Sequence, residues 1–207
     1  MGIKCIGVLD FGIGNITSIL NALSYVDADR LRVTHARQLG RCSHLILPGV
    51  GAFSSGMDKF MRSDISNELT GEVVCKGKPI LGICLGMQML SDVSYEFGVH
   101  PGLGMVHGQV VELESRKLGL PLPHIGWSEV RSNGDLKLLR GLGDPADFYF
   151  VHSFHLKPIG NVFTATSNHG VDFVSVVEHG NIFGTQFHPE KSQSNGLIVL
   201  QNFSEVD

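Results

Sequence analysis

The chain contains few cysteines and no long apolar run, and each of these absences excludes a class of protein. Its four cysteines, Cys5, Cys42, Cys75 and Cys84, are scattered without a C-x-x-C pair, which argues against a disulfide framework and a zinc site. No apolar stretch is long enough to span a bilayer, and the first residues do not have the charged segment and cleavage site of an export signal. We therefore expect a cytoplasmic protein with reduced thiols.

Positive charge is also scarce. The 207 residues include 16 Lys and Arg against 20 Asp and Glu, which gives a net charge of -4, and no basic run is present. Nucleic acid and anionic membranes are therefore excluded as expected main partners. The hydrophobic content of 43% is typical of a globular protein with a sizeable core. Because no linker, repeat or low-complexity tract divides the chain, we expect one domain over residues 1–207.

The order of apolar patterns predicts an α/β protein with a mainly parallel sheet, because strands and helices alternate in the first half. The strands predicted there are 3–9, 31–35, 44–47 and 79–83. The predicted helices are 16–26, 53–69, with Ser54 and Asp64 as possible breaks, and 85–90. Six strand-like runs separated by glycine, asparagine and proline follow, at 105–113, 125–130, 148–151, 162–166, 173–177 and 182–187. A last helix is predicted over 194–203, with Leu197, Ile198 and Leu200 toward the sheet.

The stretch Pro79 to Leu90, PILGICLGMQML, carries the first chemical signal. Gly82 and Gly86 flank Cys84 between a short apolar strand and a run of good helix formers. A nucleophile on a tight strand-to-helix turn needs small neighbours, because larger side chains would block the bend. Such a turn favours a thiolate at the helix N-terminus and directs the next N–H, that of Leu85, at a forming oxyanion. The alternative is a structural cysteine in a buried strand.

A histidine and a carboxylate follow the last predicted strand. Pro189 stops that strand, so His188 and Glu190 lie two residues apart and can point the same way. A carboxylate beside an imidazole fixes its tautomer and supports the imidazolium that forms when a thiol loses its proton. Cys84, His188 and Glu190 therefore form a candidate nucleophile, base and orienting acid. Taken alone, H-P-E is more typical of a surface turn.

Two loops contain glycine where a ligand would need close approach to the backbone. Pro48-Gly49-Val50-Gly51 is either a plain strand–helix connection or a loop that presents backbone N–H groups. The G-x-G at Gly12 and Gly14 does not continue as a dinucleotide fingerprint, because Thr17 occupies the third glycine position. Asn15 after this loop is a candidate helix cap.

Two stretches, GICLGMQ at 82–88 and QFHPEKS at 186–192, closely resemble the class I, triad-type glutamine amidotransferases. Four more stretches narrow the resemblance to the glutaminase subunits of imidazole glycerol phosphate synthases: FGIGN, PGVG, PHIGW and FYFVHSF. The resemblance covers essentially the whole chain. It implies a three-layer, flavodoxin-like fold whose mainly parallel central sheet has added antiparallel strands.

For the reaction, the resemblance implies that Cys84 attacks the side-chain amide of L-glutamine, that His188 shuttles the proton, and that Glu190 holds His188. The oxyanion would lie between the N–H of Leu85 and the Val50–Gly51 segment. Four further positions match contacts to the glutamine, namely Gln88, Glu96, Ser153 and Phe154.

For the assembly, the resemblance implies a heterodimer with a (β/α)₈-barrel cyclase, which receives the ammonia and makes imidazole glycerol phosphate and AICAR in histidine biosynthesis. It implies no metal or organic cofactor. A site that is nearly silent without its partner would need a switch. The Val50 peptide, Asn15 and Trp127 are the candidates for the switch and its sensing face, and Asn15 and Trp127 have competing roles as helix cap and core aromatic.

Three alternatives remain open. Tyr95-Glu96-Phe97-Gly98 resembles a paralogous branch that supplies ammonia for amidination of a surface-polysaccharide sugar. A cysteine peptidase or other hydrolase could use the same triad. A flavodoxin-like module could carry Cys84 without catalysis, for example as a redox sensor.

Overall fold

The computed structural model describes residues 4–132 and 134–207, and two sheets and five α-helices make up its framework. The larger sheet contains β1 (Cys5–Leu9), β2 (Asp29–Val33), β3 (His44–Gly49), β4 (Ile80–Cys84), β8 (His124–Ser132), β9 (Ala146–His152), β11 (Phe163–His169), β12 (Val171–His179) and β13 (Ile182–Thr185). The smaller sheet contains β5 (Val93–Ser94), β6 (His100–Pro101), β7 (Gly108–Glu112) and β10 (Phe154–Pro158). The helices are α1 (Ile16–Leu23), α2 (Phe53–Arg62), α3 (Ile65–Thr70), α4 (Leu85–Met89) and α5 (Gln193–Glu205).

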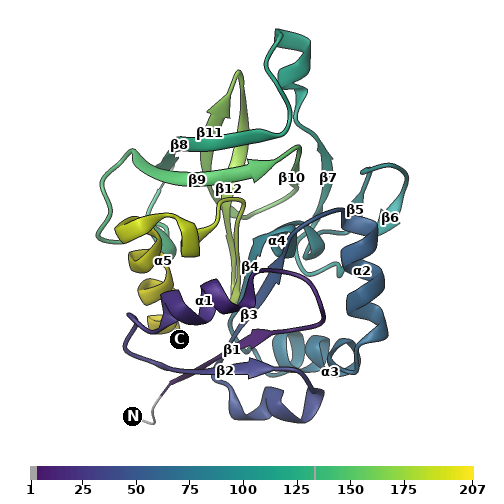
Figure 1. The fold of residues 1–207 in the computed structure, drawn as a ribbon, viewed down its shortest axis with the longest axis vertical. Helices are drawn as coiled ribbons and strands as arrows, with labels where there is room; N and C mark the ends of the chain where they lie inside the picture. Colours follow the sequence, from purple (N-terminus) through teal and green to yellow (C-terminus); the bar gives the residue numbers. More distant parts are fainter. Residues whose placement is uncertain (1–3, 133) are drawn as a thin grey trace.

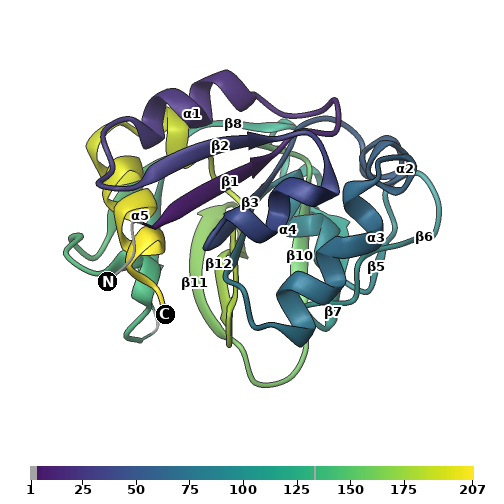
Figure 2. The same ribbon diagram turned by 90° about the horizontal axis from the view of Figure 1, so that it is seen from below.

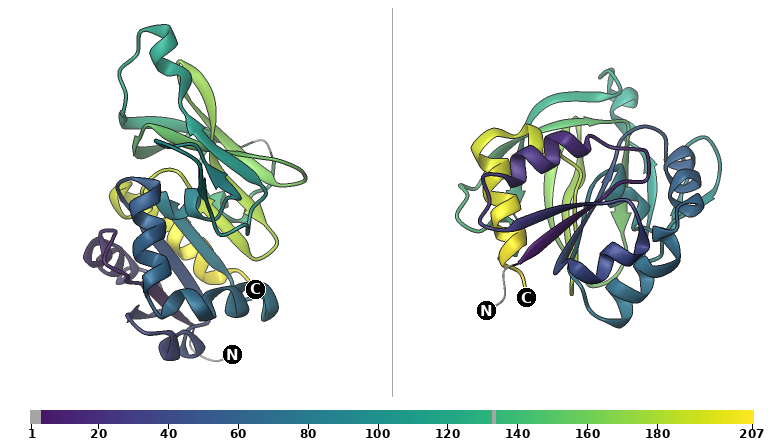
Figure 3. Two further views of the ribbon diagram at one scale, coloured as in Figure 1. Left: turned by 90° about the vertical axis from the view of Figure 1, so that its right-hand side faces the viewer. Right: turned by 60° about the horizontal axis from the view of Figure 1, so that its bottom comes forward.

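The larger sheet has the strand order β2-β1-β3-β4-β13-β12-β11-β8-β9 (Figure 1). Its first five strands pair in parallel, and its last four are joined by antiparallel pairings. Figure 3 shows the antiparallel strands rising beyond the helices at one end of the molecule. The predicted α/β fold, a parallel sheet with added antiparallel strands, is confirmed.

Helices cover both faces of the parallel strands (Figure 2). Side chains of β4 alternate between the two apolar layers, so Leu81 and Ile83 pack with α1 and α5, whereas Ile80 packs with α2, α3 and α4. Every residue of β3 and β4 is buried, as expected of parallel strands covered on both faces. The result is the expected three-layer arrangement. Within the described residues, no helix is long and apolar enough to cross a membrane.

The helical stretch predicted over 53–69 is divided into two helices, at the second of the two possible breaks named for it. Ser63 has an extended backbone, and its hydroxyl donates to the Phe60 carbonyl at 2.6 Å. This local bond competes with helix continuation, so α2 ends at Arg62 and α3 starts at Ile65. The break lies at the Asp64 position that the sequence offered as a possible interruption.

Two boundaries in the second half also differ from the prediction. The strand predicted over 105–113 begins at Gly108, whose φ of 152° and approach to the Lys157 carbonyl leave no space for a side chain. In α5, Leu200 is fully buried as predicted, but Leu197 and Ile198 are only half-buried. Val199 and Phe203 take the inward positions instead, because the helix is rotated slightly from the orientation inferred from its apolar residues.

Three glycines allow β3, β4 and α4 to meet at backbone distance. A Cβ on Gly86 would lie 1.8 Å from the Leu47 carbonyl oxygen, and one on Gly82 would lie 2.7 Å from the Gly86 carbonyl. A Cβ on Gly49 would lie 2.8 Å from the Gly86 nitrogen. All three clashes are with backbone and cannot be relieved by a rotamer change.

We predict that Gly86→Ala destabilises the fold by about 3 kcal/mol or more, because the methyl group must displace the β3 backbone. Gly71→Ala is the matched control, since Gly71 has helical backbone angles and an added Cβ would meet nothing within 4 Å. Urea unfolding of both variants measures the difference. Equal midpoints would contradict the packing described for Gly86.

Candidate active site

The candidate site lies at the carboxyl ends of three neighbouring parallel strands, β3, β4 and β13. Gly49 pairs with Cys84 across β3 and β4, and Thr185 pairs with Ile83 across β13 and β4. The segments that follow these strands therefore meet at one edge, which is where open α/β sheets bind ligands.

Cys84 stands on a strained turn between β4 and α4. Its φ of 55° and ψ of -109° are unusual for a residue with a side chain, and such strain persists only where the surroundings impose it. The residue is buried. Its thiol lies 3.8 Å from the Val151 carbonyl oxygen. The predicted strand–cysteine–helix geometry is present in the structure.

His188 and Glu190 form a buried pair. The Nδ1 of His188 is 2.8 Å from Oε1 of Glu190, and both side chains are 2% exposed. The His188 N–H donates to the Tyr149 carbonyl at 3.0 Å, and the Ser192 hydroxyl donates to the His188 carbonyl at 2.7 Å. The backbone of His188 is therefore fixed on both sides, and Glu190 orients the ring.

The other ring nitrogen of His188, Nε2, has no hydrogen-bond partner among the described residues. Burial lowers the pKa of His188, but contact with Cys84 and the bond to Glu190 outweigh it and raise that pKa to about 10. The raised pKa favours the protonated ring beside the Cys84 sulfur, and Nε2 is the ring nitrogen available to transfer a proton. This is the electrostatic setting of an activated thiol nucleophile.

A pocket of about 230 Å³ opens over Cys84. Its lining includes every residue predicted for the nucleophile, the oxyanion contacts and the glutamine contacts, together with His188: Val50, Gly51, Cys84, Leu85, Gln88, Glu96, Ser153, Phe154 and His188. Pro123, Val151 and His152 complete the lining. The pocket is smaller than the roughly 300–1,000 Å³ typical of drug-sized ligands, so it suits a single amino acid better than a peptide.

Two of the predicted glutamine contacts are already bonded within the protein. The Gln88 side chain donates to the Phe154 carbonyl at 2.8 Å and to Oε1 of Gln186 at 3.1 Å. Oε2 of Glu96 accepts from the Phe53 N–H at 2.6 Å, at the start of α2. Glu96 is thus held over the pocket by the helix that follows the Val50–Gly51 loop.

Asn15 and Trp127 lie outside the pocket. The Asn15 side chain accepts from the Ser18 N–H at 3.3 Å and caps α1, which is the competing role foreseen for it. Trp127 is 48% exposed and packs edge-to-face on Tyr149, with ring centroids 6.2 Å apart. Trp127 is therefore a surface aromatic on β8, and the core role considered for it is wrong.

The sequence did not identify Gln186 or His152 as parts of the site. Gln186 has no exposed surface, and its amide donates to Sγ of Cys84 at 3.7 Å. His152 lines the pocket and its Nδ1 lies 3.0 Å from the Phe154 carbonyl. The signal for Gln186 was a lone amide at the end of the apolar run NIFGTQF. His152 is one of ten histidines in the chain, and no motif around it distinguished it from the others.

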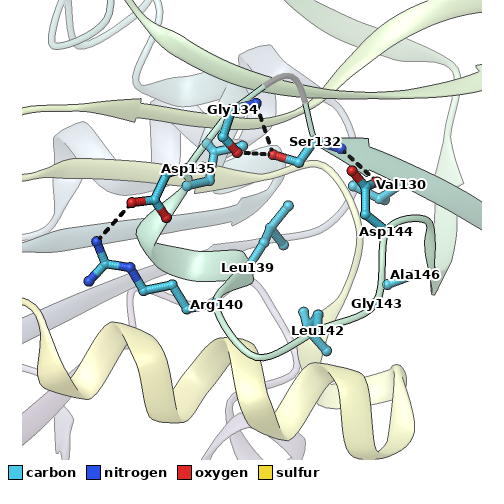
Figure 4. Close-up of a pocket in the computed structure, with 11 residues that line it drawn as sticks. Val130, Ser132, Gly134, Asp135, Leu139, Arg140, Leu142, Gly143, Asp144 and Ala146 are labelled. Atoms are coloured by element: carbon cyan, nitrogen blue, oxygen red, sulfur yellow. Dashed lines mark hydrogen bonds and ion pairs between the residues drawn. The ribbon is translucent and has the colours of Figure 1, made fainter.

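A second pocket, of about 190 Å³, lies between β8, β9 and the helical turn η4 (Lys137–Leu139) (Figure 4). Its charged groups are bonded to each other or to backbone: Arg140 pairs with Asp135 at 3.4 Å, and Asp144 accepts from the Ser132 N–H at 3.2 Å. Leu139 and Leu142 line its floor. Among the described residues that line this pocket there is no nucleophile–base pair, so the Cys84 pocket is the candidate for the chemistry.

Comparison with known proteins places the chain in a family. The model of the family "Glutamine amidotransferase class-I" matches residues 7–205. A Leptospira interrogans protein named "Imidazole glycerol phosphate synthase subunit HisH" is 42% identical over 205 residues, covering 97% of this chain and 100% of that protein. A Campylobacter jejuni (strain RM1221) protein named "Imidazole glycerol phosphate synthase subunit HisH 1" is 39% identical over 198 residues, covering 96% of this chain and 98% of that protein.

Solved structures agree on the fold. The structure titled "Structure of PurLQS from Thermotoga maritima" superposes with a TM-score of 0.74 at 20% identity, covering 98% of each chain. A structure titled "Crystal structure of glutamine amidotransferase" gives a TM-score of 0.73 at 20% identity, covering 97% of this chain and 99% of that chain. At this identity the likeness supports the architecture alone.

A cluster of buried histidines lies behind the pocket. Burial, followed by neighbouring positive charge, lowers the pKa of His124 to about 4, and burial also lowers the pKa of His155 to about 4. Nδ1 of His155 has no hydrogen-bond partner among the described residues. Between pH 6.5 and about 4, the unfolded chain therefore binds protons that the folded chain does not. Stability must fall as the pH drops through this window.

We predict that His155→Leu changes stability little at pH 7.5 but stabilises the chain by about 2–3 kcal/mol at pH 4.5, because the leucine cannot be protonated when the chain unfolds. Urea unfolding at both pH values measures this. His179→Gln is the control, since His179 is exposed. A variant that loses stability on acidification as steeply as the wild type would contradict the assignment.

Proposed function

The chain belongs to the class I glutamine amidotransferase family, and from this membership and the Cys84 pocket we propose that it is a glutaminase subunit that hydrolyses L-glutamine to glutamate and ammonia. The observation that carries the proposal is the buried His188–Glu190 pair, with its atoms 2.8 Å apart and Nε2 of His188 unbonded among the described residues, in the pocket of a cysteine on a strained turn. The pocket volume favours glutamine over a peptide, and so disfavours the peptidase alternative.

In the proposed reaction, the Cys84 sulfur forms a bond to the side-chain carbonyl carbon of glutamine. His188 gives its proton to the nitrogen, the C–N bond breaks, and ammonia leaves a thioester on Cys84. His188 then takes a proton from a water molecule, whose oxygen attacks the thioester to release glutamate and restore the thiolate. Glu190 supports the charged ring throughout.

The negative charge on the carbonyl oxygen needs hydrogen-bond donors. We assign the Leu85 N–H, at the start of α4, and the Val50–Gly51 segment as these donors, since both line the pocket with Cys84. Gln88, Glu96 and the Ser153–Phe154 backbone hold the amino-acid end of the glutamine. No metal or organic cofactor has a step in this scheme.

The relatives' names support imidazole glycerol phosphate synthase in histidine biosynthesis as the assembly that uses the ammonia. A protein named as a subunit implies a partner subunit. We propose a heterodimer with a (β/α)₈-barrel cyclase that forms imidazole glycerol phosphate and AICAR. The relatives do not favour the surface-polysaccharide branch considered from Tyr95-Glu96-Phe97-Gly98.

We further propose that the partner covers the face of β8 that carries Trp127 and controls the site from there. Trp127 pairs with Tyr149 across β8 and β9, and the Tyr149 carbonyl accepts from the His188 N–H. The Val50 peptide, 44% exposed between two glycines, is the proposed switch. Asn15, which follows the loop that contains Gly12 and Gly14, is the second position proposed to contact the partner.

Replacing the nucleophile tests the proposed function directly. We predict that Cys84→Ala, assayed in the complex with the cyclase subunit, loses glutamine-dependent synthesis by roughly 10⁴–10⁶. Synthesis from ammonium salts should persist, because ammonia enters after the glutaminase step. Near-normal glutamate release by Cys84→Ala would exclude this residue as the nucleophile.

Replacing the surface aromatic tests the control of the site. We predict that Trp127→Ala lowers partner-stimulated glutaminase activity by up to about 10²–10³, the effect of one oxyanion donor. The basal activity and the partner affinity should change much less. The three quantities are measured by glutamate release with and without the cyclase subunit and by calorimetric titration. Unchanged stimulation would remove Trp127 from the mechanism, and high basal activity of the wild type would exclude a gate.

A further inference from the structure

We infer that Gln186 is a catalytic residue that donates a hydrogen bond to the Cys84 thiolate. Its amide nitrogen lies 3.7 Å from the Cys84 sulfur, the atom that the proposed function makes the nucleophile. The inference rests on that function for the reaction the sulfur performs, and it assigns a role to a residue outside the Cys84, His188 and Glu190 triad.

Strand register explains how Gln186 reaches the sulfur. β13 and β4 pair in parallel, and Thr185 lies opposite Ile83 at their carboxyl ends. The next residue of each strand therefore emerges at the same level, which places Gln186 beside Cys84. The Gln186 backbone N–H donates to the Ser175 carbonyl of β12, the neighbour of β13 on the side away from β4, at 2.9 Å, so the Gln186 backbone is fixed by both neighbouring strands.

Burial gives Gln186 a cost that its contacts must offset. The side chain has no exposed surface, and a buried amide is costly unless its polar atoms are bonded. Its Oε1 accepts from Gln88 at 3.1 Å, and its Nε2 faces the sulfur. An apolar residue would fill the same space without this cost, so the amide has a polar task here.

Neighbouring bonds determine which end of the amide faces Cys84. The Phe154 carbonyl can only accept, so the Gln88 amide turns its nitrogen toward it. The same Gln88 nitrogen is the atom that faces Gln186. That nitrogen requires an oxygen opposite it, which leaves the Gln186 nitrogen directed at the sulfur. The reverse orientation would place two nitrogens together and an oxygen against the thiolate.

A donor aimed at the sulfur complements the other groups around it. The His188 cation approaches the same sulfur, with Glu190 behind its ring, and the Val151 carbonyl of β9 lies 3.8 Å away. This carbonyl is an acceptor and opposes a negative sulfur. The Gln186 N–H, a charge-assisted donor to the thiolate, offsets that opposition. Gln186 therefore stabilises the negative charge that the sulfur carries when it acts as the nucleophile.

The competing explanation is purely structural: Gln186 would serve only as the acceptor that positions Gln88. Two substitutions separate the roles. Gln186→Glu keeps an oxygen for Gln88 and nearly the same volume, but removes the donor and adds negative charge. Gln186→Met removes both polar contacts and adds no charge. If Gln186 contacts the thiolate, the glutamate variant loses more Cys84 reactivity than the methionine variant. If its role is only structural, the methionine variant loses more.

The experiment measures the alkylation rate of Cys84 by iodoacetamide from pH 5 to 10, with the Cys84 peptide quantified by mass spectrometry. Alkylation requires no glutamine, so it is independent of the proposed function. We expect Gln186→Met to slow the reaction about tenfold at neutral pH and to raise the pH of half-maximal rate by about one unit, with a larger upward displacement for Gln186→Glu. Gln201→Glu, at a half-buried position on α5 outside the Cys84 pocket, is the control and should leave the profile unchanged.

Profiles of both Gln186 variants that coincide with the wild type would overturn the inference, as would a profile displaced only in Gln186→Met. If Gln186→Glu does not fold by circular dichroism, Gln186→Met is compared with Gln88→Met, which removes the contact between the two glutamines but keeps the Gln186 donor. A larger displacement for Gln186→Met supports the inference, and equal displacements would overturn it. Glutamate release in the cyclase complex is measured separately. A wild-type complex that alkylates normally but releases no glutamate would refute the proposed function and leave the Gln186 contact standing.

Discussion

The whole site depends on the close approach of three backbone segments at the end of β4. Gly86 lies so near the Leu47 carbonyl that a Cβ would be 1.8 Å from it, and Gly82 and Gly49 are similarly enclosed. This contact forces the chain to turn sharply at Cys84, which adopts a φ of 55°. The strain at one residue is small compared with the burial of β3 and β4 on both faces. The sheet therefore holds the nucleophile in a conformation that it would not adopt alone.

The polar groups around this turn form one connected set. Gln186 contacts the sulfur, Gln88 joins Gln186 to the Phe154 carbonyl, and His152 lies against that same carbonyl. Beyond His152, the His124 ring lies 3.1 Å away and reaches the Ser128 hydroxyl at 2.9 Å. Burial lowers the pKa of His152 to about 3, so its ring is neutral and can both donate to Phe154 and accept from His124. Buried groups that are fully bonded in this way fix one arrangement of the pocket wall.

The sequence allowed prediction of the parts of the site that depend on spacing. Gly82-x-Cys84-x-Gly86 encodes the turn, and Pro189 between His188 and Glu190 encodes the pair that follows β13. Gln186 and His152 could not be selected in this way, because their roles come from strand register between segments about 100 and 70 residues apart in the chain from Cys84. The helix break was foreseen only as a possibility at Asp64, because the contact that fixes it at Ser63 does not follow from spacing. A hydroxyl bond to the preceding turn ended the helix, although the apolar period continued through it.

The two halves of the large sheet contribute different groups to the site. The parallel half positions Cys84, Gln186 and His188, while antiparallel β9 contributes the Val151 carbonyl that faces the sulfur. β9 also accepts the His188 N–H through Tyr149, and its partner β8 carries the exposed Trp127. A partner subunit that binds β8, as we propose, would therefore press on the strand that holds both His188 and the Val151 carbonyl near the Cys84 sulfur. Because β8 and β9 are hydrogen-bonded along seven residue pairs, a displacement at the surface must move β9 as well. A partner bound on β8 could thus influence the surroundings of the Cys84 sulfur through β9 alone, without further intervening residues.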